Sequence, residues 1–224
     1  MTQSRPDMST RIKEKVNKSV EQLERARAEF NFRSLESHIS RDARVLDVGA
    51  WACYLGQLLK DRLECDVLSL DVTDANKTSM PFRLFDGRIF PVESKSFDVV
   101  LLLYVLHHAA DDEILMKEAR RVCAEDGCVI VAEDSVDGLW NRWLTFGLHV
   151  WLKIVARLGW EGRFRPVPEW QQRFQSAGFS VLRTVHLGHH LGKRFWPNNI
   201  LFVLKKSPVS SVAHKAVDPL LVKG

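Results

Sequence analysis

A short apolar strand, a turn and the start of a helix follow one another in Val45-Leu46-Asp47-Val48-Gly49-Ala50-Trp51-Ala52-Cys53-Tyr54-Leu55-Gly56. The strand is predicted over residues 44–49 and ends at a glycine, which permits a tight turn. The helix is predicted over 54–63. A buried strand that passes through a turn into a helix is typical of a parallel α/β sheet.

Strands and helices alternate on both sides of this stretch. A helix up to about residue 40 precedes it, with apolar residues every three or four positions among charges. Further strands are predicted over 66–71, 82–87, 97–103, 127–132, 179–187 and 200–204, and further helices over 111–123, 139–160 and 168–177. This order predicts an α/β fold, a doubly wound, mostly parallel seven-stranded sheet with helices on both faces.

The pattern indicates one domain over residues 1–206 without internal repeats. Residues 1–40 are expected to form a helical cover, and residues 135–165 contain an apolar helical segment. The Ser/Val/Pro-rich segment 207–224 is expected to be a disordered tail.

Acidic residues follow the second and third predicted strands. In a doubly wound sheet, ligands bind in the crevice at the carboxyl ends of the strands. Asp71 ends the second strand 22 residues after Gly49, a spacing at which an acid accepts hydrogen bonds from ribose hydroxyls. Asp86 ends the third strand, where it can meet the exocyclic amine of an adenine. The sequence therefore predicts a nucleoside-binding crevice.

These residues together resemble the class I S-adenosylmethionine-dependent methyltransferases, and most closely the small-molecule branch that includes quinone-ring C-methyltransferases. The similarity covers about residues 44–133, with a weaker continuation to 204. Its most specific part is the run Phe85-Asp86-Gly87, Phe90-Pro91, Ser96-Phe97-Asp98-Val99-Val100 and Val105-Leu106-His107-His108. The resemblance implies S-adenosyl-L-methionine as the cofactor, bound by Asp47, Gly49, Ala50, Trp51, Asp71, Val72, Asp86, Gly87 and Tyr104.

The resemblance also implies a role for each part of the crevice. Asp47 supports the loop, Gly49 lets the backbone approach the methionine part, and Asp71 holds the ribose. Asp86, with the glycine after it, meets the adenine, and Tyr104 lines the methyl-donor side.

The sequence departs from the family at its glycine motif. Where the family has G-x-G-x-G, this chain has Gly49-Ala50-Trp51-Ala52-Cys53, so two of three glycines are missing. We expect Trp51 either to point away from the cofactor or to reshape its pocket, and Cys53 to have an ordinary backbone conformation. S-Adenosylmethionine carries no pyrophosphate, so the pattern predicts altered binding rather than none.

Two histidines follow the fourth predicted strand, at the end of the sheet where an acceptor is expected. His107 is the candidate catalytic residue, because an imidazole is a suitable base near neutral pH when the acceptor must lose a proton. His108 is a candidate substrate contact. The alternative is that one histidine caps the turn beside Asp111 and the other only packs.

The predicted helix over 139–160 has a wider apolar arc than one sheet face covers. A hydrophobic acceptor, a second subunit of a homodimer or peripheral contact with a membrane surface could cover the rest. The alternative is a helix sandwiched between the core and the N-terminal helix. In the resembled family this part of the chain covers the acceptor, which implies substrate contacts at Trp140, Trp143, Arg163 and Arg165.

No metal site is expected. His186, His189 and His190 are close in sequence but have no cysteine or acid at ligand spacing nearby, so they are interpreted as solvated loop residues. The 4 cysteines form no C-x-x-C pair, which indicates reduced thiols and a cytoplasmic protein.

Composition and charge exclude some classes of partner and function. In 224 residues, 46% are hydrophobic and the net charge is only +4, without a basic stripe, so nucleic acid is not an expected partner. No secretory signal or spanning segment is recognised, and the protein is expected to be cytoplasmic, with peripheral membrane association left open. The leading hypothesis is an enzyme that methylates a small, hydrophobic molecule. The alternative is a non-catalytic binding or scaffold protein that has lost its cofactor.

Overall fold

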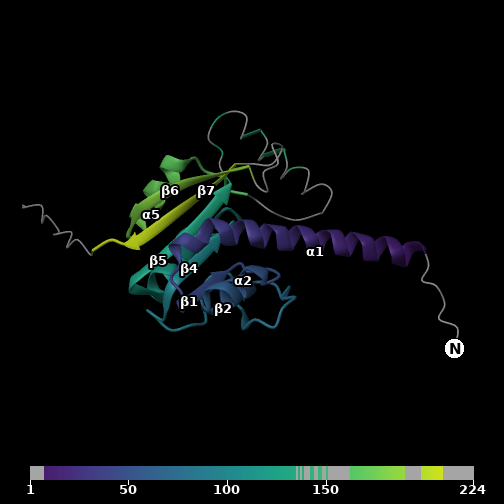
Figure 1. The fold of residues 1–224 in the computed structure, drawn as a ribbon. Coiled ribbons are helices and arrows are strands. Elements are labelled where there is room, and N and C mark those ends of the chain that lie inside the picture. The colour runs from purple at the N-terminus through teal and green to yellow at the C-terminus, as the bar shows by residue number, and fades with distance from the viewer. Residues whose placement is uncertain are drawn as a thin grey trace, which may run out of the picture.

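The computed structural model describes residues 8–134, 136, 138, 142–143, 146–147, 150, 162–189 and 198–208. In this part of the chain, seven strands form one sheet in the order β3-β2-β1-β4-β5-β7-β6 (Figure 1). The strands are β1 (Arg44–Val48), β2 (Asp66–Asp71), β3 (Phe82–Leu84), β4 (Phe97–Leu103), β5 (Cys123–Asp134), β6 (Phe179–His189) and β7 (Asn198–Lys206). The helices are α1 (Met8–Leu35), α2 (Tyr54–Leu63), α3 (Asp112–Val122) and α5 (Val167–Ser176), with short 3-10 helices η1 (Glu36–His38) and η2 (Leu106–His108).

The strand directions confirm the predicted mostly parallel sheet. Strands β1 to β5 are parallel to their neighbours, whereas β7 runs antiparallel to both β5 and β6. The chain builds one half of the sheet outward from β1 through β2 and β3, then returns to add β4 on the other side of β1. The carboxyl ends of β1 and β4 therefore flank the topological switch point, where ligands bind in open α/β sheets.

Alternating side chains of the strands supply the two halves of the core. In β4, Val100 and Leu102 face one helical layer, and Val99 and Leu101 face the other. The first layer includes α3 and α5, and its largest buried side chains include Trp170. The second includes α2 and the carboxyl-terminal half of α1. Helices on both faces, as predicted, explain why β4 is almost entirely apolar.

Several element boundaries differ from the predicted ones. α2, β2 and β4 have the predicted bounds, but α1 ends at Leu35, before a separate 3-10 turn, and β3 ends at Leu84. β5 begins at Cys123, several residues earlier than predicted. Its first part contains polar residues and a register shift against β4 between Phe97 and Val99, so simple alternation does not reveal it.

The apolar helix predicted over 139–160 lies almost wholly outside the described residues, as does most of the predicted tail. Among the helices that the structure describes, none has the length and apolar character needed to span a bilayer. All four cysteines are free thiols.

Candidate functional site

The turn after β1 brings the backbone close to its neighbours. The N–H groups of Gly49 and Ala50 both donate to the carbonyl oxygen of Leu70, at 2.8 and 3.1 Å. Gly49 has a φ of +75°, and a Cβ atom there would lie 2.4 Å from Cγ2 of Val105. Only glycine therefore fits this position without displacing the segment after β4.

The two positions where glycines are missing keep a left-handed backbone. Trp51 has a φ of +47° and Cys53 a φ of +59°. The expectation that Cys53 has an ordinary backbone is therefore wrong. Its N–H donates to the carbonyl of Ala50 in a tight turn just before α2, and this turn imposes the left-handed conformation. The substitutions change the side chains of the loop and leave a backbone shape that glycine favours.

Asp71 fixes this loop from the end of β2. Its Oδ2 accepts the N–H of Trp51 at 2.8 Å, and its Oδ1 accepts the N–H of Thr73 at 3.0 Å. A carboxylate offers about four lone-pair sites. Each oxygen of Asp71 can therefore accept one further donor, as binding to the two hydroxyls of a ribose requires. Val72 follows and is largely exposed.

Asp47 is a second carboxyl group under the loop. It is buried in β1 between Ser69 of β2 and Leu101 of β4. Burial, together with the negative charge of Asp71, raises the pKa of Asp47 to about 7. The Asp47 carboxyl therefore exchanges its proton near neutral pH.

The turn after β3 approaches the same crevice. Asp86 lies two residues beyond the end of β3 and is exposed, rather than ending the strand as predicted. Its Oδ1 accepts the N–H groups of Arg88 and Ile89, both at 2.8 Å, and these bonds lower its pKa. Gly87 has a φ of +77°, and a Cβ there would come within 3.3 Å of the Val72 side chain. The structure thus brings the loops after β2 and β3 together.

Tyr104 lies directly after β4, on the other side of the switch point. It is buried, has a φ of +60°, and donates its N–H to the carbonyl of Ala132 at 2.7 Å. The guanidinium of Arg27 in α1 lies over its ring, 4.6 Å from the centroid. Burial raises the pKa of the Tyr104 hydroxyl.

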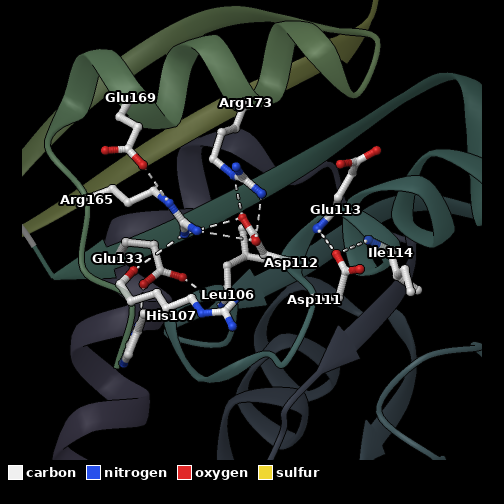
Figure 2. Close-up of polar contacts among 11 residues, drawn as sticks. Leu106, His107, Asp111, Asp112, Glu113, Ile114, Glu133, Arg165, Glu169 and Arg173 are labelled. Carbon is white, nitrogen blue, oxygen red and sulfur yellow. Dashed lines mark hydrogen bonds and ion pairs between the residues drawn. The ribbon is translucent and has the colours of Figure 1, made fainter. Parts of the chain in front are cut away.

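His107 is buried and paired with an acid that the sequence reasoning missed. Its Nδ1 forms a hydrogen bond with Oε2 of Glu133, near the end of β5, and both side chains are buried (Figure 2). Oε1 of Glu133 accepts the N–H of Leu106 at 2.9 Å. Burial raises the pKa of Glu133 to about 8. A carboxylate directly after the apolar run 128–132 was the available signal for this pair.

The segment before α5 covers this histidine. The N–H of Arg163 donates to the carbonyl of His107 at 2.9 Å, and the Phe164 ring lies 4.8 Å from the imidazole, centroid to centroid. Arg165, predicted to contact substrate, is buried and has acidic partners within the protein (Figure 2). It pairs with Asp112 at 3.3 Å and with Glu169 at 2.8 Å.

Comparisons with known proteins agree with this geometry. Residues 46–131 match the family described as a methyltransferase domain. The chain has the class I methyltransferase fold. No curated protein matches it.

Solved structures share the methyltransferase fold at low identity. A SAM-dependent methyltransferase from Thermotoga maritima is 16% identical, with a TM-score of 0.62, over 85% of this chain and 96% of its own. One from Aquifex aeolicus is 13% identical, with a TM-score of 0.56, over 78% and 88%. The [4+2]-cyclase SpnF is 14% identical, with a TM-score of 0.56, over 77% of each chain.

The remaining predicted residues lie at the edge of the methyltransferase fold or outside the described part. His108, Arg163 and Trp143 are exposed, and Trp140 is not described. His186 and His189 lie in β6. Within the described ranges, no group of three His, Cys, Asp or Glu residues could hold a metal ion.

The raised pKa of Asp47 predicts a pH-dependent stability. The carboxyl group titrates near pH 3.8 when unfolded and near 7 when folded. Between these values the folded protein keeps a proton that the unfolded chain has lost, so stability falls as pH rises. From pH 5 to 7 we expect a loss of about 2 kcal/mol from this group. Urea denaturation at pH 5, 6 and 7 measures it. Asp47→Asn should remove this part of the slope, and equal slopes in both proteins would contradict the assignment.

Proposed function

We propose that this chain binds S-adenosylmethionine at the carboxyl ends of β1, β2 and β4 and transfers its methyl group to a small, hydrophobic acceptor. The observation that carries the proposal is the Asp71 carboxylate. It is buried at the switch point, holds the loop after β1 through Trp51 N–H, and keeps lone pairs for two hydroxyl donors. The match of residues 46–131 to a methyltransferase domain supports it.

The residues present fit the adenosyl group. Asp71 would hold the ribose, and the exposed carboxylate of Asp86 would meet the adenine amine, since the turn bonds of Asp86 use only Oδ1. Gly49, Ala50 and Trp51 would form the wall beside the methionine part, with Asp47 beneath them. The left-handed backbone at the loop preserves this wall although two glycines are absent.

When bound, S-adenosylmethionine supplies an activated methyl group on its sulfonium. The protein must then align the acceptor with that carbon, which accounts for much of the rate acceleration in such displacements. His107 is proposed to receive a proton from acceptors that must lose one. Its Nδ1 is engaged by Glu133, so this role would use Nε2 and would require an ionised Glu133 carboxylate that accepts the Nδ1 proton, a state that the raised pKa of Glu133 favours on the alkaline side of neutral. Glu133 would fix the orientation of the ring.

The acceptor is proposed from the surroundings of His107. Phe164 supplies an aromatic wall against the imidazole, and Phe146 packs against Phe164 at 5.8 Å. This apolar cover, together with the exposed Trp143 nearby in sequence, supports the proposal of a hydrophobic acceptor. The acceptor would reach a cytoplasmic enzyme from solution or from a membrane surface. The exposed Arg163 is then a candidate contact for a polar group on that molecule.

Calorimetric titration with S-adenosylmethionine and S-adenosylhomocysteine tests the cofactor proposal. We expect saturable one-to-one binding with dissociation constants in the micromolar range, on the order of −8 kcal/mol. Adenosine, which keeps the ribose and adenine contacts, should bind more weakly but measurably. No binding of any of the three at millimolar concentration would reject the enzyme and favour a scaffold protein with this fold.

A further inference from the structure

One turn of α1 is tied to two loops of the crevice by a single side chain. Oε1 of Glu24 accepts the indole N–H of Trp51 at 2.8 Å, and its Oε2 pairs with the Lys77 ammonium at 2.6 Å. Trp51 belongs to the loop after β1 and Lys77 to the loop after β2. The Glu24 side chain is only 15% exposed, whereas its partners Lys77 and Trp51 are 43% and 53% exposed, so water reaches both contacts from the partner side.

Neighbouring residues of α1 contact the same edge of the sheet. The guanidinium of Arg25 lies 4.1 Å from the ring centroid of Tyr54, at the start of α2. Arg27 lies over Tyr104, which follows β4. Residues 24–27 therefore contact segments that follow β1 and β4, which flank the switch point, and β2, which lies next to β1. This turn of α1 lies across the mouth of the crevice.

Trp51 connects α1 directly to the proposed ribose site. Its main-chain N–H donates to Oδ2 of Asp71, while its side-chain N–H donates to Glu24. A movement of α1 away from the sheet must break the second bond and release the indole. A ligand on Asp71 and the docked position of α1 are therefore linked through one residue.

The two halves of α1 are held in different ways. Ala28, Phe32 and Leu35 in its carboxyl-terminal half are buried in the core. Residues 14–20 are exposed, and the amino-terminal half extends past the sheet (Figure 1). Between them, the turn at 24–27 is held mainly by hydrogen bonds, an ion pair and cation–π contacts. Such contacts exchange with water at little net cost, so this turn can open while the carboxyl-terminal half of the helix stays anchored.

We propose that Glu24 is a positioning residue that closes α1 over the bound cofactor, acting through Trp51 and Lys77. This inference rests on the proposed function for its ligand. The closed turn slows the escape of an adenosyl ligand. When the turn opens, S-adenosylmethionine enters the crevice and S-adenosylhomocysteine leaves it. The tryptophan in place of a motif glycine then has a function of its own, because it supplies the indole N–H that glycine lacks.

The test compares Glu24→Ala with Glu29→Ala. Glu29 also lies on α1 but pairs with Arg62 of α2, away from the crevice, so it is a matched control. In stopped-flow chase experiments, Glu24→Ala is expected to release S-adenosylhomocysteine about tenfold faster than the wild type, because the variant loses both charge-assisted contacts to the crevice loops. Trp51→Phe, which removes the indole N–H with its five-membered ring and keeps an aromatic side chain, should act in the same direction. Glu29→Ala should leave the release rate unchanged.

Amide hydrogen exchange of the ligand-free protein supplies a second readout. Glu24→Ala should speed exchange across residues 14–27 several-fold and leave 28–35 unchanged. If the wild type binds no S-adenosylhomocysteine, the proposed function fails, and faster exchange in Glu24→Ala would still support closure by Glu24. Unchanged exchange in that variant, or equal release rates for Glu24→Ala and Glu29→Ala, would overturn the inference.

Discussion

Replacing Asp71 by alanine is expected to weaken binding of S-adenosylhomocysteine at least 100-fold. The variant loses two charge-assisted hydrogen bonds to the ribose, each worth about 1.5–3 kcal/mol. It also leaves the N–H groups of Trp51 and Thr73 without their present acceptor, so the loop after β1 loses its anchor. Isothermal titration calorimetry of the wild type and the variant measures the change directly.

The exposed Asp74, three residues further along the same loop, is the control for this change. Asp74→Ala removes the same charge but none of these bonds, so its affinity should stay within about twofold of the wild type because an exposed charge contributes little. Asp71→Ala should still unfold cooperatively, with a stability loss of about 1–3 kcal/mol from the two unpaired N–H groups. Similar affinities for Asp71→Ala and Asp74→Ala would remove Asp71 from the ribose site.

The fold could be predicted because its signals are local. The β4 strand is apolar apart from Asp98, and its bounds coincide with the predicted ones. Asp71 was recognisable as the acid that ends β2, and its place at the switch point follows from the order of strands alone. The length of β5 was underestimated because a bulge breaks its pairing with β4 and polar residues occupy its first part.

The polar partners across the site depend on contacts that no local pattern reveals. Glu133 lies 26 residues from His107 in the sequence, and only the pairing of β4 with β5 brings their ends together. Arg165 was interpreted as a substrate contact because the corresponding part of the resembled family covers the acceptor and an arginine there could hold an anionic group. Its partner Asp112 is 53 residues away. Glu24 was one of several charges on an apparently solvated helix face.

The backbone of the loop after β1 shows a second reason why part of the site could not be predicted from the sequence. A cysteine is expected to have a negative φ, since a left-handed conformation costs a residue with a Cβ about 1–2 kcal/mol. Here the tight turn before α2 requires that conformation at Cys53, and tertiary contacts offset the cost. The local preference of one residue was overruled by the geometry of the elements on either side.

Replacing Asp112 by alanine is expected to cost about 3–5 kcal/mol of stability, the range for breaking a buried ion pair from one side. The Asp112 carboxylate is buried and bonds Arg173 at 2.6 and 2.8 Å as well as pairing with Arg165. Without it, the buried Arg165 guanidinium keeps the half-exposed Glu169 as an ion-pair partner, together with the Arg163 carbonyl at 3.5 Å and the Trp170 ring. The weakly compensated charge of the buried guanidinium, rather than the lost bonds, is expected to account for most of the cost.

Asp111, the preceding residue, separates this effect from helix capping. Its Oδ1 accepts the N–H groups of Glu113 and Ile114 at the start of α3, so Asp111→Ala should cost about 1 kcal/mol as the loss of an N-cap. Urea denaturation of both variants gives the comparison, and equal losses would show that Asp112 acts only as a helix-end charge. Because Arg165 follows Phe164 in the segment over His107, Asp112→Ala should also loosen the proposed acceptor wall. Faster hydrogen exchange at residues 162–166 in Asp112→Ala, but not in Asp111→Ala, would show that the buried ion pair holds the proposed acceptor wall in place.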